Sequence, residues 1–212
     1  MPTKTIIAAL AGLLLWAAPA AAEVAGGFKT GLNIATFVGD DARGAGGDMI
    51  SKAGLAIGGF IIFPLEKVPF KLQPEFLLSS KGAVYKWDVL GAVYENTVSL
   101  TYLEIPVLAR FEVPTRHGVT PAVLLGPYLG IKVSAKSESR TIGASSTADI
   151  DNIKAIDPGF AVGALVDIDT NRGVLSLEAR YSRSLATIVE DSGGGEADIR
   201  NSAASILVGY KF

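Results

Sequence analysis

The sequence contains no cysteine and carries no block of positive charge. Without cysteine the chain can form no disulfide, attach no lipid to a thiol and build no thiolate metal site. When Lys4 is set aside with the N-terminal segment, 18 basic residues stand against 21 acidic ones, a net charge of −3 at neutral pH. A protein that follows a phosphate backbone clusters its basic residues, so nucleic acid is not an expected partner.

Long hydrophobic runs are also missing beyond the N-terminal segment, because charged residues, glycine or proline interrupt each apolar stretch. A helix that crosses a membrane needs ~20 consecutive apolar residues. Any membrane-spanning part of this chain must therefore be made of strands, which satisfy their backbone groups in lipid only when the sheet closes.

The N-terminal segment has the three parts of a secretory signal. Lys4 supplies positive charge, residues 6–16 form an apolar stretch, and three alanines end at Ala22. The pattern predicts a signal peptide over residues 1–22, cleaved after Ala22. A transmembrane anchor is the alternative, but the apolar run is short and a proline follows it. We expect residues 23–212 to form one exported domain.

From Gly27 onward the chain repeats a single pattern: about ten residues alternate between apolar and polar, and a turn rich in glycine, aspartate, asparagine or serine follows. A period of two is typical of strands. The pattern predicts an all-β fold, an antiparallel up-and-down transmembrane barrel of eight strands. The expected strands are residues 27–38, 53–64, 70–81, 99–112, 119–135, 158–168, 173–187 and 200–212.

Each expected strand has one oily face and one charged face. In residues 99–112, for example, Leu103 and Val107 fall on one face and Glu104 and Arg110 on the other. An outer-membrane barrel turns its oily face to lipid, whereas a soluble barrel turns it inward. Alternation alone does not decide between them, so a soluble periplasmic lipocalin-like ligand-binding barrel remains the alternative.

The positive mean hydropathy, the export signal, the aromatic residues and the connections favour the membrane. Short turns at residues 65–69, 113–118 and 169–172 alternate with long loops at 39–52, 82–98, 136–157 and 188–199, as in outer-membrane barrels with short periplasmic turns. Five phenylalanines fall at the short-turn end and predict a periplasmic aromatic girdle: Phe28, Phe63, Phe70, Phe111 and Phe212.

An eight-stranded barrel is wide enough only for its own side chains, which excludes a wide diffusion pore. Buried charges must pair, so we expect a structural ion-pair network in the lumen rather than a transport or proton path. The expected members are Lys71, Glu75, Glu104, Arg110, Lys132, Glu178, Arg180 and Lys211.

Two features resist a regular barrel. Pro74, Pro106 and Pro127 lie within expected strands, where each removes a ladder hydrogen bond, and bulges are the expected accommodation. Residues 53–64 contain two adjacent glycines followed by a continuous apolar run, so alternation does not assign the facing of this strand.

Three motifs in the middle of the chain follow one another in a recognisable order. They are Leu72–Glu75 leading to Ser79–Gly82, then Tyr102–Leu108, then Gly126–Gly130 ending in Lys136. In order and spacing they resemble the PorT-like outer-membrane β-barrel family. The resemblance implies an exported eight-stranded barrel with prolines at these positions and, through the founding member, a link to protein secretion. It carries over no active-site residues. The terminal Phe212 resembles the signal read by barrel-assembly machinery.

The residues that could be catalytic or bind a metal are better interpreted as ordinary turn and loop residues. The single histidine, His117, lies in a short turn at the end expected to be periplasmic, away from where outer-membrane lipid hydrolases act. The acidic, glycine-rich loops around Asp40, Asp41 and Asp48 and around residues 190–198 fit neither an EF-hand nor a phosphate loop. We therefore expect no catalytic residue, no metal and no cofactor.

Paired carboxylates such as Glu75 and Glu104 could do acid/base work only if the packed lumen admitted a substrate. A lipid-modifying enzyme is thus the third hypothesis, after the soluble binder.

The leading hypothesis is a non-enzymatic barrel that sits in outer-membrane lipid and presents its loops to an envelope or extracellular protein. In the second long loop, Tyr85, Trp87 and Tyr94 are candidate contacts, although they could also lie at the outer lipid boundary.

Overall fold

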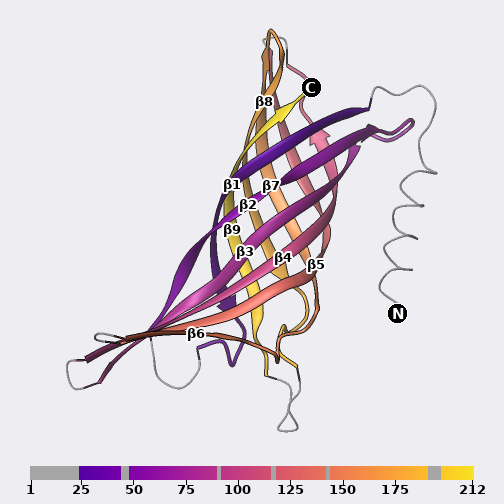
Figure 1. The fold of residues 1–212 in the computed structure, drawn as a ribbon. Helices are drawn as coiled ribbons and strands as arrows, with labels where there is room; N and C mark the ends of the chain where they lie inside the picture. Colours follow the sequence, from indigo (N-terminus) through magenta and orange to yellow (C-terminus); the bar gives the residue numbers. More distant parts are fainter. Residues whose placement is uncertain (1–23, 44–47, 90–91, 116–117, 142–143, 191–196) are drawn as a thin grey trace.

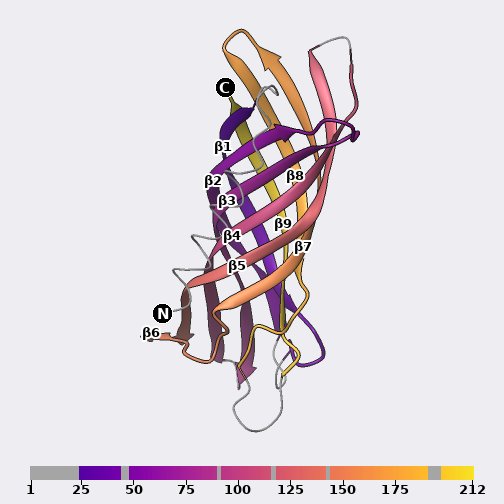
Figure 2. The same ribbon diagram turned by 90° about the vertical axis from the view of Figure 1, so that its right-hand side faces the viewer.

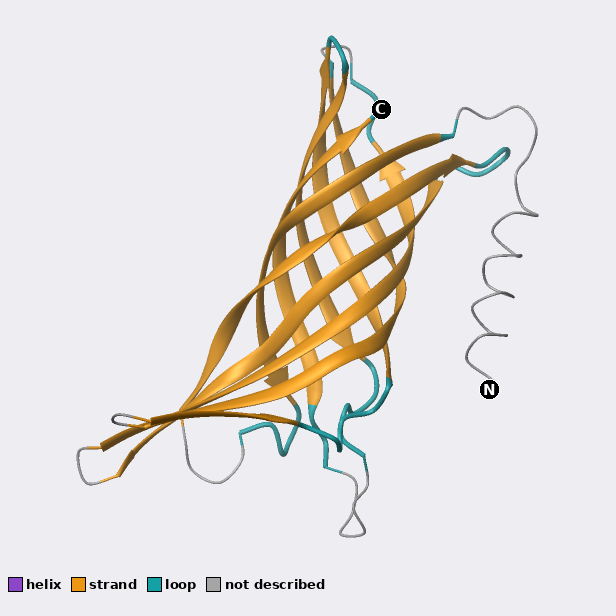
Figure 3. Ribbon diagram, viewed as in Figure 1, coloured by secondary structure: helices purple, strands orange, loops and turns teal. Residues whose placement is uncertain are grey.

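The computed structural model describes residues 24–43, 48–89, 92–115, 118–141, 144–190 and 197–212. The predicted signal peptide and His117 lie outside the described residues. Within them, no helix is long and apolar enough to cross a membrane. The described chain contains nine strands (Figure 1 and Figure 3): β1 Ala25–Val38, β2 Asp48–Pro64, β3 Lys71–Val89, β4 Ala92–Glu112, β5 Val119–Thr141, β6 Ala144–Asp149, β7 Ile156–Thr170, β8 Gly173–Ser184 and β9 Arg200–Lys211.

Eight of these strands form a closed ring. Strands β1 to β5 pair with one another in chain order, β5 pairs with β7, and β7, β8 and β9 follow in order. The ring closes because β9 pairs with β1, and every pairing is antiparallel. Strand β6 lies outside the ring and pairs only with β5 among the described strands. The predicted all-β antiparallel barrel of eight strands is therefore confirmed (Figure 2).

The barrel turns its oily face outward. In β1, Leu32 and Ile34 are 57% and 58% exposed. Asn33, which lies between them, is 2% exposed, and Lys29, which precedes them, is 3% exposed. The same alternation runs through β7, β8 and β9. The soluble lipocalin-like alternative is wrong, because a soluble barrel would need this apolar surface inside.

The structure also assigns the facing of β2. Its lumen-facing residues are Ala56, Phe60 and Ile62, and its outward ones are Leu55, Ile57 and Ile61.

The prolines do not cause the expected bulges. The register between β3 and β4 is the same before and after Pro74, and the ladder omits only the pairs between it and Leu77. The β4–β5 register likewise continues past Pro106 and Pro127 after a short gap. A proline lacks the N–H of one ladder bond but adds no residue, so a gap without a register shift accommodates it.

Register shifts occur elsewhere, between Ser51 and Ala56 of β2 and beside Val133 of β5.

Two of the predicted long loops are strands instead. Residues 82–89 and 92–98 continue β3 and β4 as a paired extension, and residues 136–141 and 144–149 are the end of β5 and its partner β6. These ends of β3, β4 and β5 form, with β6, one projecting sheet at the long-loop end, at the lower left of Figure 1, and residues 48–51 of β2 pair with the start of its β3 part. We call residues 83–98 and 135–149 the arm. Its strands escaped prediction because polar residues lie on both of its faces, so oily and polar residues do not alternate along it.

Candidate functional site

The middle of the lumen holds a quartet of buried charges from three of the ring strands, β1, β3 and β8. Lys29 Nζ lies 2.8 Å from Glu75 Oε1 and 2.7 Å from Glu178 Oε2. The Arg180 guanidinium donates to both oxygens of Glu75, at 2.7 and 2.9 Å, and also pairs with Glu178 at 2.5 Å. Each cation therefore touches both anions, an arrangement in which no buried charge is left uncompensated.

A second group of charges closes the lumen toward the short-turn end. Arg110 donates to Asp167 at 2.7 Å and to Glu112 at 2.7 Å, and Lys211 reaches the same Asp167 oxygen at 2.8 Å. Lys71 pairs with Glu112 at 2.7 Å at the more exposed rim. Gln73 accepts from Arg110 and donates to Glu75, so a side chain joins this group to the quartet.

The third group lies toward the long-loop end. Lys81 forms an ion pair with Glu104 and also lies 4.7 Å from the centre of the Tyr128 ring. Asn201 donates to Asp157 at 2.8 Å. Both the ion pair and the cation–π contact are favourable for an ammonium that is removed from water.

An apolar cluster covers this end of the lumen. Loop residues Ala42, Ile153 and Ile188 pack with Phe37 and Leu100 from the strand ends. The loops are also tied to one another, since Lys154 N donates to Ile188 O at 2.7 Å and Ile153 bridges to Val189. These loops fold over the mouth, whereas the arm projects away from it.

Side chains fill much of the lumen. Two cavities lined by lumen residues have volumes of about 10 Å³ each, about the space of one water molecule. The charges of the three groups balance, with six cations and six anions: Lys29, Lys71, Lys81, Arg110, Arg180 and Lys211 against Glu75, Glu104, Glu112, Asp157, Asp167 and Glu178. The arrangement is chemically a neutral plug.

The structure places most of the predicted lumen residues in these groups. Glu75, Glu104, Arg110, Glu178 and Arg180 are buried there, and Lys211 and Lys71 lie toward the rim. Lys132 is an exception, because its ammonium contacts the Ile153 carbonyl instead of a carboxylate. Lys132 still lies on the lumen-facing row, since it pairs across the strands with the buried Tyr102, but its neighbour there is Ile153 of the apolar cluster.

Sequence reasoning missed four charged members of the lumen: Lys29, Lys81, Asp157 and Asp167. Two of them carried a readable signal. Lys29 alternates with Phe28, and Asp167 alternates with Val166 and Ile168, so the alternation rule would have assigned both to the lumen.

The five phenylalanines of the predicted girdle lie on or beside strand ends at the short-turn end. Phe28 packs against Tyr210 with ring centres 5.9 Å apart, and Phe70 packs against Phe111 at 5.4 Å. Phe212 follows β9 and is 75% exposed, while Phe63 near the end of β2 is half-buried.

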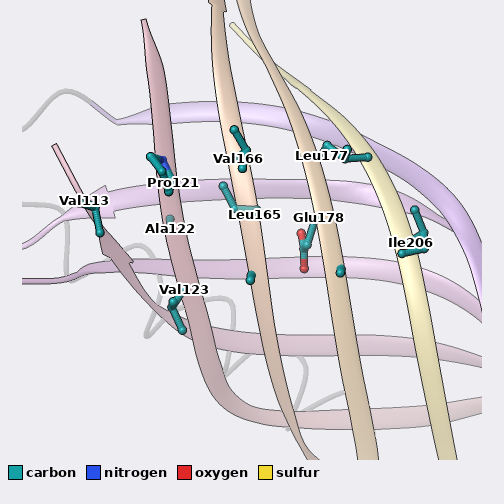
Figure 4. Close-up of a pocket in the computed structure, with 11 residues that line it drawn as sticks. Val113, Pro121, Ala122, Val123, Leu165, Val166, Leu177, Glu178 and Ile206 are labelled. Carbon is teal, nitrogen blue, oxygen red and sulfur yellow. The ribbon is translucent and has the colours of Figure 1, made fainter. Parts of the chain in front are cut away.

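The outer wall between these ends is apolar. A groove of about 410 Å³ lies on it. Figure 4 shows residues that line this groove, among them the outward-facing Val123, Val166 and Ile206. Neighbouring residues of β8 face opposite sides of the barrel wall: Leu177 is exposed on the outer side, and Glu178 is buried on the lumen side.

The three candidate contact aromatics lie on strands of the arm, not in a loop. The Tyr85 hydroxyl donates to the Ala42 carbonyl at 2.9 Å and its ring stacks on Trp87, with centres 6.0 Å apart. Trp87 is paired across the strands with Tyr94, and both line a groove of about 350 Å³. Tyr85 thus anchors the arm to the cap, and the other two face the groove.

The candidate chemical groups do not assemble. Glu75 and Glu104 belong to different ion-pair groups, each neutralised by its own cation. Asp41 accepts a hydrogen bond from the Asp198 backbone at 2.8 Å. Within the described ranges, no three His, Cys, Asp or Glu residues are placed to hold a metal ion. Asp191 to Glu196 lie outside the described residues.

Comparison with known proteins gives one family match. Residues 17–190 match the sequence profile described as outer membrane protein beta-barrel domain. No curated protein matches the chain. Among solved structures, the chain is similar to neisserial surface protein A from Neisseria, at 13% identity and a TM-score of 0.44, covering 88% of this chain and 97% of that one. It is also similar to the outer membrane protein OprG from Pseudomonas aeruginosa, at 14% identity and a TM-score of 0.43, covering 89% and 94%.

Proposed function

Since this chain belongs to the outer-membrane protein β-barrel domain family, we propose that it is a non-enzymatic barrel whose arm contacts an envelope or extracellular partner. The observation that carries the proposal is that side chains fill the lumen, whereas the groove on the arm is open. Charged side chains and an apolar cap close the lumen, whereas the arm presents an open aromatic groove. Interaction is thus supported at the arm rather than through the barrel.

The direction of the arm supports an extracellular partner. Outer-membrane barrels have short periplasmic turns and longer external connections. Here the connections between β2 and β3, β4 and β5, and β7 and β8 are short, and the arm lies at the opposite end. On this orientation the five phenylalanines form the periplasmic girdle and the N-terminal segment of residues 1–22 is removed during export.

The lack of cysteine makes the orientation directly testable. A cysteine introduced by Ser139→Cys on the arm should react with a membrane-impermeant maleimide on intact cells. A cysteine introduced by Arg172→Cys in the β7–β8 turn should react only after the outer membrane is opened. The reverse pattern would contradict the proposed orientation.

The interaction itself is tested by photo-crosslinking. A photoreactive residue at Tyr94 should give discrete adducts with another envelope or extracellular molecule. The matched control is the same residue at Leu177, which faces lipid. Should both positions give the same products, or Tyr94 none, the arm would not be an interaction surface.

A role in protein secretion is a narrower version of the same proposal. It is supported by the three ordered PorT-like motifs, between Leu72 and Lys136. A strain lacking this protein would then stop exporting particular proteins, and an unchanged exported proteome would remove the secretion role while leaving the arm's interaction in place.

A further inference from the structure

The arm has two faces of different chemistry. Residues paired across antiparallel strands share a face, so the register sorts the side chains of β3 to β6. One face carries only uncharged described residues, among them Tyr85, Trp87, Tyr94, Asn96, Ser137, Ser139, Thr141 and Ser146. The other face carries the charges: Lys86, Asp88, Glu95, Lys136, Glu138, Arg140 and Asp149.

The charges of the second face are largely paired among themselves. Lys86 lies 3.0 Å from Glu95, and Arg140 lies 2.8 Å from Glu138. Because these charges pair with one another, no cluster of charges of a single sign adjoins the uncharged face. A ligand held on that face must therefore bind through contacts other than charge.

The groove of about 350 Å³ opens on the uncharged face. Trp87, Tyr94, Asn96, Ser139 and Thr141 line it, and the alternating residues Glu95 and Arg140 complete the lining. Its volume falls within the range of small-molecule sites. The Asn96 amide is oriented by Ser137, whose hydroxyl donates to Asn96 Oδ1 at 2.9 Å, so the NH₂ group is available as a donor.

This combination of groups selects among ligand classes. A sulfated or phosphorylated ligand would require an unpaired cation at the groove, but the one cation in its lining, Arg140, is paired with Glu138. A hydrocarbon chain would leave the amide and hydroxyls without partners. A neutral sugar presents C–H groups on the face of its ring and hydroxyls around the edge. Aromatic rings pack against the C–H groups of the sugar, and amides and hydroxyls form hydrogen bonds with its hydroxyls.

We propose that the uncharged face of the arm binds a neutral hexose-based glycan. One sugar ring stacks on Trp87, and its hydroxyls bond to Asn96 and Thr141. The inference rests on the proposed role of the arm as the interaction surface, and it specifies the chemistry of the partner.

The chain supplies its own reporter for a binding experiment. It has two tryptophans, and Trp16 lies in the predicted signal peptide, so Trp87 is the single tryptophan of the processed protein. Purified protein in a detergent without a sugar head group is titrated with maltotriose, chitotriose and lactose, and with dextran sulfate as the charged contrast. At least one neutral oligosaccharide should give a saturable change in Trp87 emission, and dextran sulfate should give none.

Variants locate the site. By calorimetry, Trp87→Ala should abolish binding and Tyr94→Ala should weaken it about tenfold, a loss of ~1.4 kcal/mol. Lys136→Gln, on the charged face and outside the groove, should bind as the unaltered protein does. The shift in electrophoretic mobility on heating shows that each variant is folded.

Two results would overturn the proposal. One is that no neutral oligosaccharide changes Trp87 emission or releases heat, and the other is that only dextran sulfate binds and Lys136→Gln weakens it. If adducts still form from a photoreactive residue at Tyr94, the arm remains an interaction surface and only the glycan assignment fails.

Discussion

The lumen and the arm share strands, and one face of β3 runs through both, yet the side chains on this face have different surroundings in the two regions. In β3, Glu75 and Lys81 face the lumen and are buried in ion pairs, whereas Tyr85 and Trp87 continue the same alternating row beyond the barrel. Inside the ring, the row meets side chains from the opposite wall. On the arm the row meets no opposite wall: Tyr85 contacts the loop residue Ala42, and Trp87 beyond it lines the open groove that we propose as a binding surface.

The difference predicts where substitutions should cost stability. A buried charge whose partner is removed stays unpaired in a region of low polarity, whereas an exposed pair exchanges its contact for water. Changes in the lumen should therefore affect folding, and changes on the arm should affect interaction only.

Removing the shared anion of the quartet should have the largest effect. Glu75→Ala leaves Lys29 and Arg180 with one carboxylate between them, and the free energy of unfolding should fall by about 3–5 kcal/mol. Urea unfolding in detergent, followed by Trp87 emission, measures the change. Glu138→Ala on the arm is the matched control and should cost no more than ~1 kcal/mol. Equal effects at both positions would end the distinction between the two regions.

Packing in the lumen gives the next effect. The Tyr128 ring lies over Gly159, where an added Cβ would be 2.2 Å from the ring. Gly159→Ala must displace Tyr128 from its place beside Lys81, at a cost of about 1–3 kcal/mol in the same unfolding experiment. Gly209→Ala is the matched glycine, because its Cβ would meet its nearest neighbour at an ordinary 3.4 Å. A destabilisation by Gly209→Ala as large as that by Gly159→Ala would contradict the packing argument.

Shortening the arm should have the smallest effect on stability. Replacing residues 86–95 by a tight turn keeps Tyr85 and its bond to Ala42, so the free energy of unfolding should change by no more than ~0.5 kcal/mol. Because the variant lacks Trp87, its unfolding is followed by far-UV circular dichroism. A photoreactive residue at Ser139, which lines the same groove, should lose in this variant the adducts that it forms in the full-length arm. A large loss of stability would mean that the arm is part of the folding core.

The sequence predicts the barrel well where lipid lies on one side of the wall. Leu103 and Glu104 sort to opposite faces by alternation, and the structure places the first outside and the second inside. Alternation works there because lipid and lumen impose different polarities on neighbouring residues.

The same rule fails where the wall is irregular or leaves the membrane. Alternation placed Lys132 on the lumen-facing row correctly, but it could not show that a loop carbonyl, that of Ile153, would be its partner instead of a carboxylate. The extra residue at Val133 is likewise invisible in the pattern of polarity. On the arm the informative contrast is charged against uncharged, as between Lys86 and Trp87, and a search for oily residues passes over it. The pairing of particular charges, such as Lys29 with both Glu75 and Glu178, depends on how the ring closes and requires the structure.

Ion conductance of the purified barrel in a planar lipid bilayer tests the closed lumen most directly. The account predicts no steady conductance above that of the bare bilayer, because the three charge groups and the apolar cap fill the passage. A steady, high conductance from the folded protein would contradict it.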